Sequence, residues 1–140
     1  MDLADALARL RDHRGGVLAT QKADGRPQLS NIVYAIDDDI VRISITADRA
    51  KYRNLVRTPI ASLHVSRPDF WAYLVLEADA ELTPVAAAPD DATVDELVDL
   101  YRTLQGEHDD WDEYRQAMVK DRRLVLRLHP TRAYGMWPAG

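Results

Sequence analysis

The sequence predicts an α+β fold in which about six antiparallel strands form a small closed or nearly closed barrel, with a few helices inserted between them. Segments with the two-residue alternation of half-buried strands follow one another through short turns of the hairpin type. No glycine-rich loop of the G-x-G-x-x-G type is present, and the strands do not alternate with helices. Both observations argue against a parallel, doubly wound sheet.

Each element follows from its local pattern. Strand patterns, bounded by turns such as Ala-Asp-Gly and Asp-Asp-Asp, occur at residues 17–22, 26–36, 40–46, 60–67, 70–83 and 122–130. Apolar residues recur with the helical period at residues 2–12, 49–57 and 93–105, and in a short segment that carries Trp111, Tyr114 and Met118. Asp48 is the expected N-cap of the second helix, which must end before Pro59.

Length and composition limit the class of protein. A chain of 140 residues predicts a single domain over residues 1–140. The absence of cysteine excludes disulfides, thiol catalysis and cysteine zinc sites, and favours the cytoplasm. No apolar run is long enough for a signal peptide core or a membrane span. A net charge of -5 argues against nucleic-acid binding, and the four histidines lack metal-ligand spacing, so no metal is expected.

The stretch "SITADRAKYRNLVRTP" gathers positive charge at the start of a predicted helix in an acidic chain. With Asp48 as N-cap, Lys51 takes the position where Glu or Gln normally completes a capping box, and it opposes the helix dipole by about 0.3–1 kcal/mol. A bound anion reverses that sign, because the free N–H groups, Arg49 and Lys51 can converge on one phosphate. Solvation is the alternative, and it is favoured for Arg53 and Arg57.

Polar residues occupy both faces of the second predicted strand. The alternation in "RPQLSNIVY" places Gln28 and Ser30 on one face and Asn31 on the other. Buried amides and hydroxyls require partners, which here are either neighbouring backbone, a subunit contact or the edge of a polar heterocycle. Ser44 and Thr46 of the next strand can join the same wall.

Trp71 and Tyr73 share one face of a predicted strand. Such a pair can stack on a ring, seal a dimer or pack in the core, and core packing is the commonest outcome. No G-x-S-x-G motif is present, so serine-histidine-aspartate catalysis has no support.

The stretches "GVLATQKADGRPQLSNIVYAI", "SITADRAKYRNLVRTPIASLHV" and "APDDATVDELVDLYRTLQGEHDDWDEYRQAMVKDRRLVLRL" resemble the flavin/deazaflavin oxidoreductases of the pyridoxamine-phosphate-oxidase-like split-barrel superfamily. The resemblance runs from about Gly15 to Leu128 and is greatest to the actinobacterial branch that uses the deazaflavin coenzyme F-420. It implies a six-stranded antiparallel split β-barrel with flanking helices. It also implies a homodimer that holds two cofactors in grooves at its interface.

The resemblance assigns roles to the candidate residues. It implies that Arg49 and Lys51 bind the cofactor phosphate, and that the ring system is lined by Gln28, Ser30, Asn31, Ser44, Ile45 and Thr46. Trp71 and Tyr73 would come from the partner subunit or the groove floor.

The implied activity is hydride transfer from reduced F-420 to an activated double bond or conjugated heterocycle of a small molecule, so that the cofactor carries the chemistry. No catalytic residue is assigned, and Tyr34, Tyr73 or water can provide the proton. An FMN-containing oxidoreductase and a non-catalytic cofactor-binding protein are the alternatives. The chain ends in "YGMWPAG" in place of the arginine segment of enzymes that oxidise pyridoxamine phosphate, so that reaction is not expected.

Overall fold

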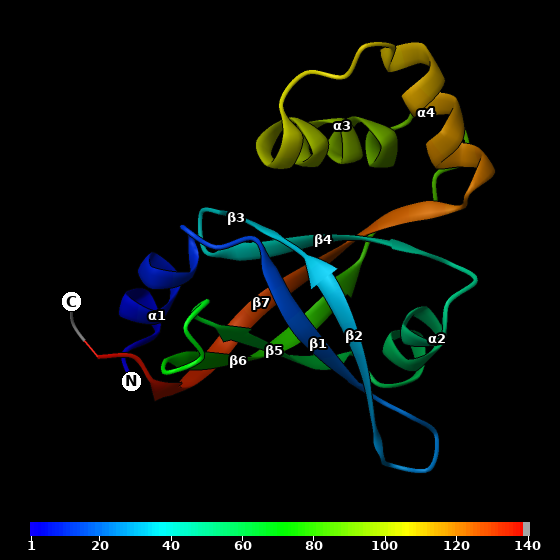
Figure 1. Cartoon of the computed structure of the whole chain (residues 1–140). Coiled ribbons are helices and arrows are strands. Elements are labelled where there is room, and N and C mark those ends of the chain that lie inside the picture. Colours follow the sequence, from blue (N-terminus) through cyan, green and yellow to red (C-terminus); the bar gives the residue numbers. More distant parts are fainter. Residues whose placement is uncertain (139–140) are drawn as a thin grey trace.

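A computed structural model describes residues 1–138 and shows a curled antiparallel sheet with four helices (Figure 1). The strands are β1 (Gly15–Gln21), β2 (Pro27–Val33), β3 (Ala35–Asp37), β4 (Ile40–Thr46), β5 (Ile60–Ser66), β6 (Tyr73–Leu82) and β7 (Arg123–Met136). The helices are α1 (Leu3–Leu10), α2 (Ala50–Arg57), α3 (Ala92–Gln105) and α4 (Trp111–Lys120). The strand order in the sheet is β2-β1-β5-β6-β7-β4-β3.

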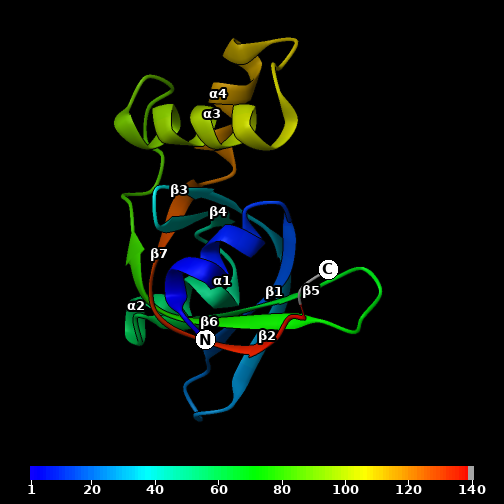
Figure 2. The ribbon, with the colours of Figure 1, turned by 90° about the vertical axis from the view of Figure 1, so that its left-hand side faces the viewer.

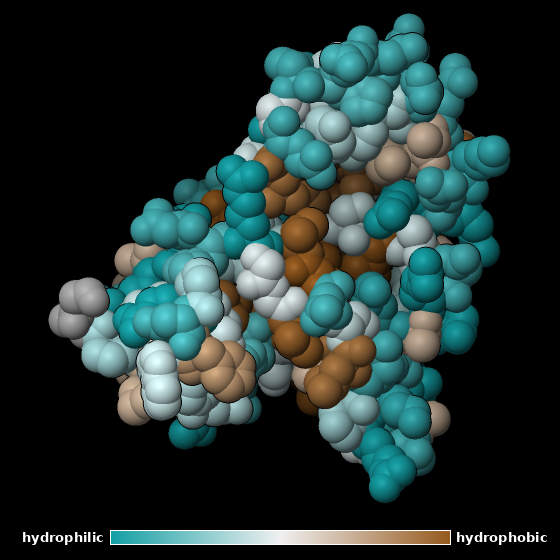
Figure 3. Space-filling model, in the orientation of Figure 1, coloured by the Kyte–Doolittle hydropathy of each residue, from teal (hydrophilic) through white to brown (hydrophobic). Residues whose placement is uncertain are grey.

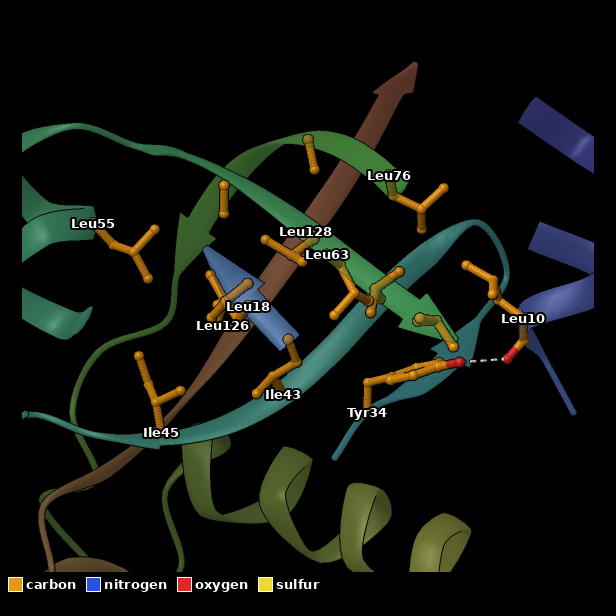
Figure 4. Close-up of a cluster of buried hydrophobic side chains, with 14 of the residues drawn as sticks. Leu10, Leu18, Tyr34, Ile43, Ile45, Leu55, Leu63, Leu76, Leu126 and Leu128 are labelled. Atoms are coloured by element: carbon orange, nitrogen blue, oxygen red, sulfur yellow. Dashed lines mark hydrogen bonds between the residues drawn. The ribbon is translucent and has the colours of Figure 1, made fainter. Parts of the chain in front are cut away.

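The sheet has seven strands where six were predicted, because the expected strand 26–36 is divided at Tyr34. β2 and β3 lie at opposite ends of the strand order although only Tyr34 separates them in sequence. The Tyr34 hydroxyl donates a hydrogen bond to the Leu10 carbonyl oxygen at 2.8 Å (Figure 4). The Tyr34 N–H donates to the Arg14 carbonyl oxygen at 2.8 Å. These bonds fix the chain where it passes from one end of the sheet to the other, which curls the sheet.

The core lies inside the curl. Large aliphatic side chains from the strands meet there with α1 on one side and α2 on the other (Figures 1, 2 and 4). The largest fully buried members are Leu10, Leu18, Tyr34, Ile43, Ile45, Leu55, Leu63, Leu74, Leu76, Leu124 and Leu126. The helices therefore cover the two open ends of the curled sheet.

Helices α3 and α4 stand outside the sheet, beyond β4 and β7 (Figure 1). Asp91 and Asp110 cap them, with side chains that accept hydrogen bonds from the N–H groups of Val94 and Glu113. The acidic residues around these two positions thus mark the starts of α3 and α4. Glu96 of α3 binds the sheet through an ion pair with Arg42 at 3.0 Å and a second one with Arg127.

Strand β7 extends beyond the predicted residues 122–130 as far as Met136. Its residues 126–136 pair with β6, and the outer end of this pairing places Tyr73 opposite Met136. Gly135 has a φ of 146°, and a Cβ atom there would lie 2.3 Å from the Tyr73 carbonyl oxygen. Only glycine permits this close approach of the two backbones.

Candidate cofactor site

A slit separates the free edges of β2 and β4. β2 is paired only with β1, and β3 covers the edge of β4 only at residues 40–42. Free edges offer unpaired backbone N–H and C=O groups to a ligand. A hollow of about 510 Å³ opens here, lined by Asn31, Ile32, Val33, Ser44, Ile45, Thr46, Arg49, Lys51 and Arg123.

Helix α2 begins at this hollow without a side-chain cap. Asp48 does not cap it, contrary to the prediction: the N-cap is Arg49, and the helix starts at Ala50. The first turn contains no acidic residue, and Lys51 is its second position. The unpaired N–H groups of a helix start carry partial positive charge, so Arg49 and Lys51 add to a potential that is already positive.

Arg123 supplies a third cation that the sequence analysis missed. It is the first residue of β7 and lies opposite Thr46 in the β4–β7 ladder. One of its terminal nitrogens donates to the Ser44 hydroxyl at 3.3 Å, whereas its buried Nε has no hydrogen-bond partner within residues 1–138. The arginine pair at 122–123, at the start of the last strand pattern, was the available signal, but the pairing of this strand with β4 could not be deduced from local periodicity.

The three cations have no carboxylate partner in the part of the chain that the structure describes, since none of them takes part in a salt bridge of residues 1–138. Burial lowers the pKa of Lys51, and the charges of Arg49 and Arg123 lower it further. An anionic group in the hollow would remove this repulsion and give the Arg123 Nε an acceptor. The residues present therefore fit a phosphate.

A smaller hollow of about 340 Å³ adjoins the first and shares Thr46, Arg49 and Arg123 with it. Its remaining lining residues are Asp48, Lys120, Asp121 and Arg122. Carboxylates are thus present at this outer part of the basic region, unlike in the main hollow.

The structure brings together six of the ten predicted site residues: Asn31, Ser44, Ile45, Thr46, Arg49 and Lys51. Gln28 and Ser30 lie on the opposite face of β2 from Asn31, and they hydrogen bond to each other at 3.2 Å. Ile32 and Val33 line the hollow but were not predicted.

Trp71 and Tyr73 are not at the hollow of their own chain. Tyr73 starts β6 and pairs with Met136 at the end of β7, whereas the hollow lies at the first residue of β7. Its ring stacks on His64, and Trp71 is 76% exposed in the preceding turn. Neither residue is therefore part of the groove floor within one subunit.

Tyr34 is removed from the candidate proton donors. The residue is fully buried, and its hydroxyl hydrogen is already donated to the Leu10 carbonyl oxygen. Burial also raises the pKa of Tyr34 above its usual range. A phenol held in this way has a structural role at the bend between β2 and β3.

Two classes of feature are absent from residues 1–138. These residues contain no group of three or more histidine or acidic side chains placed to hold a metal ion. No helix among them has the length and apolar character needed to cross a membrane.

A curled antiparallel sheet with a basic hollow at its open slit defines a split-barrel fold. The family model described as pyridoxamine 5'-phosphate oxidase matches residues 3–137, and the chain belongs to this family, within the split-barrel superfamily of flavin and deazaflavin oxidoreductases.

Three solved structures illustrate the range of similar proteins. An F420 reductase is 26% identical, with 86% of this chain and 89% of that chain covered and a TM-score of 0.64. The heme storage protein HutZ from Vibrio cholerae is 18% identical, with 97% and 96% covered and a TM-score of 0.70. An FAD-binding protein from Mesorhizobium loti is also 18% identical, with 96% and 92% covered and a TM-score of 0.68. The last two likenesses show the fold alone.

Proposed function

We propose that this protein is a coenzyme F-420-dependent oxidoreductase that transfers a hydride from the reduced deazaflavin to an activated double bond or conjugated heterocycle of a small molecule. The observation that carries the proposal is the convergence of Arg49, Lys51 and Arg123 on one hollow without a carboxylate partner within residues 1–138. The 26% identity to an F420 reductase over most of both chains favours the deazaflavin over FMN.

The residues of the hollow divide the binding of such a cofactor between them. Arg49, Lys51 and Arg123 would hold the phosphate, because charge-assisted hydrogen bonds are the strongest available here. Asn31 and the free edge of Ser44 to Thr46 would hydrogen bond the polar part of the ring system. When bound, the cofactor supplies the hydride chemistry, and the chain supplies binding, orientation and electrostatics.

The proposal includes a homodimer. No aromatic side chain lines the hollow within one subunit, so a ring that stacks on the cofactor must come from a second copy. One outward face of the curled sheet is a surface for a second copy. Strand pairing places Asn31, Val17, His64, Val75 and Tyr134 in one row across five strands, on the same face. Asn31 of the hollow thus lies at the end of this row.

The same face exposes large apolar side chains. Leu29 is 62% exposed and Val33 is 55% exposed on β2, and Tyr134 and Met136 are exposed on β7. Figure 3 shows hydrophobic residues gathered at the centre of the molecular face that carries β1 and β2. Large exposed apolar patches mark interaction sites. A second copy seated on this face would cover them and could bring its Trp71 and Tyr73 to the hollow.

Titration of the purified protein with F-420 and, separately, with FMN tests the proposal, with cofactor fluorescence as the signal. We expect F-420 to bind more tightly. Tighter binding of FMN would instead support an FMN-dependent oxidoreductase. A yellow colour of the purified protein would support the same alternative. Binding of F-420 without hydride transfer to any of a broad panel of activated alkenes and heterocycles would favour a non-catalytic binding protein. Binding of neither cofactor would reject the proposal.

A further inference from the structure

A chain of side-chain hydrogen bonds runs from helix α2 to strand β2. Arg57 donates to the side-chain oxygen Oδ1 of Asn54 at 2.8 Å, and the side-chain nitrogen Nδ2 of Asn54 donates to the Thr20 hydroxyl at 3.2 Å. Thr20 in turn bonds Gln28 at 3.3 Å, and Gln28 bonds Ser30 at 3.2 Å. Asn54 and Thr20 are buried, with 6% and 3% exposed. This set of five residues is called the relay below.

The first member fixes the orientation of the Asn54 side-chain amide. A guanidinium group can only donate, so Arg57 must face the side-chain oxygen of Asn54. The Asn54 NH₂ group then faces Thr20, whose hydroxyl accepts this bond and in the structure donates its own hydrogen to the Gln28 side-chain oxygen. The Gln28 NH₂ group therefore faces Ser30. The Arg57 side chain is itself held by the Gln21 carbonyl oxygen at 3.0 Å, so the direction does not depend on a mobile surface group.

The last member is left with an unused hydrogen. The Ser30 oxygen accepts from Gln28, and the Ser30 hydroxyl donates to no acceptor within residues 1–138. Ser30 shares its face of β2 with Ile32, the next residue on that face, which lines the hollow. Ser30 is half-buried and does not itself line the hollow, so water can accept this hydrogen in the free protein, and a ligand that extends past Ile32 can accept it in the complex.

We propose that the relay holds the Ser30 hydroxyl as a hydrogen-bond donor to an acceptor atom of the bound ring, a carbonyl oxygen or an unprotonated ring nitrogen. Thr20, Gln28, Asn54 and Arg57 are then positioning residues, which act through Ser30. Arg57, for which the sequence favoured simple solvation, has a defined role. The inference rests on the proposed function for the identity of the ring. It adds that in this hydrogen bond the protein is the donor and the ring is the acceptor.

The variant Asn54→Asp should reverse the direction of the hydrogen bonds from Thr20 to Ser30, and the side chain at position 54 keeps nearly the same volume. A carboxylate accepts from Arg57 with one oxygen, but its other oxygen cannot donate to Thr20. The Thr20 hydroxyl must then donate to the aspartate and accept from the Gln28 NH₂ group. The Gln28 oxygen turns toward Ser30, whose hydroxyl donates to it and is no longer free. The Arg57 contact is kept, so loss of folding is not expected.

Two measurements on wild type and Asn54→Asp test the proposal. In nuclear Overhauser spectra of the cofactor-free protein, the Gln28 amide protons should lie near the Ser30 β protons in the wild type and near the Thr20 methyl group in the variant. The variant should bind F-420 about tenfold more weakly, the loss expected for one hydrogen bond. Arg53→Gln is the matched control on the same helix, because the Arg53 side chain makes no hydrogen bond to the relay and its one hydrogen bond within residues 1–138 is to the Asp48 carbonyl oxygen, so its affinity should equal that of the wild type.

Wild-type spectra with the Gln28 amide protons beside Thr20 would overturn the relay direction. Unchanged F-420 affinity in Asn54→Asp, with the amide reversed, would overturn the role of Ser30 as a donor. If the wild type binds neither F-420 nor FMN, the proposed function fails together with the ligand of Ser30. The spectra of the free protein still decide the direction of the relay in that case, so the two failures are distinguishable.

Discussion

Arg123 lies directly opposite Thr46 in the antiparallel ladder between β4 and β7, and this pairing places a cation from the last strand beside the start of α2. Its Nε is buried without a hydrogen-bond partner in residues 1–138. Buried donors without partners are costly. The β4–β7 pairing thus completes a basic hollow that neither segment forms alone.

Arg123→Gln should weaken cofactor binding about 10- to 100-fold, because a hydrogen bond to a charged group contributes about 1.5–3 kcal/mol. The dissociation constant from fluorescence titration is the measurement. Arg132→Gln is the matched control, since Arg132 lies on the outer half of β7, away from the hollow. Equal affinities of the two variants would remove Arg123 from the site.

Cofactor affinity should fall at alkaline pH. The pKa of Lys51 is lowered by burial and by its two arginine neighbours, so the free protein loses this proton below the usual range of lysine. A bound phosphate favours the charged amine and raises that pKa again. Affinity is therefore full below the lowered pKa of the free protein and decreases as the pH rises through it.

Titrations at a series of pH values from neutrality to about pH 10 measure this dependence. Lys51→Arg keeps its charge over the whole range, so this variant should lose the dependence while it still binds the cofactor. A wild-type affinity that is flat with pH would show that Lys51 makes no contact with the anion.

Leu29→Lys should convert the proposed homodimer to a monomer. Leu29 is exposed on β2, within the outward face proposed for the second copy, and a lysine there would have to be desolvated on association. Sedimentation velocity at micromolar concentration measures the change. Val56→Lys is the control, because Val56 is equally exposed but lies on α2. A monomeric wild type would contradict the proposed dimer.

Tyr34→Phe should lower the free energy of unfolding by about 1 kcal/mol, the usual value for one hydrogen bond. The loss is not larger, because the Leu10 carbonyl oxygen keeps a second donor, the His13 N–H at 3.1 Å. Urea unfolding followed by circular dichroism measures the difference. Tyr52→Phe is the reference, since its hydroxyl has no partner within residues 1–138, and equal losses in both variants would exclude a role for the bond to Leu10.

Local patterns predicted the strands and helices of the chain but not the way in which the sheet is divided. The apolar alternation continues through Tyr34, so nothing in it distinguishes one long strand from β2 and β3 at opposite ends of the sheet. The division depends on a long-range hydrogen bond from Tyr34 to Leu10. The periodicity of apolar residues indicates which side chains face inward, but it cannot predict a hydrogen bond between residues that are far apart in the sequence.

The sequence predicted those residues of the candidate site that lie in one continuous segment of the chain. Arg49 and Lys51 follow from the charge pattern of one helix start, and Ser44 to Thr46 from the adjoining strand. Arg123 enters through strand pairing, and the hydrogen bonds of Gln28 and Ser30 depend on Asn54 from another element. The N-cap was wrong by one residue because the chain stays extended at Arg49.

The most direct test of the basic hollow is an amide ¹H–¹⁵N NMR titration of the wild-type protein with F-420. The account predicts that the largest shift changes occur at Thr46, Arg49, Ala50, Lys51 and Arg123, around the start of α2. Changes confined to a different hollow of about 440 Å³, which is lined by Ala19, Ser62, Glu77 and Arg132 among others, would contradict it.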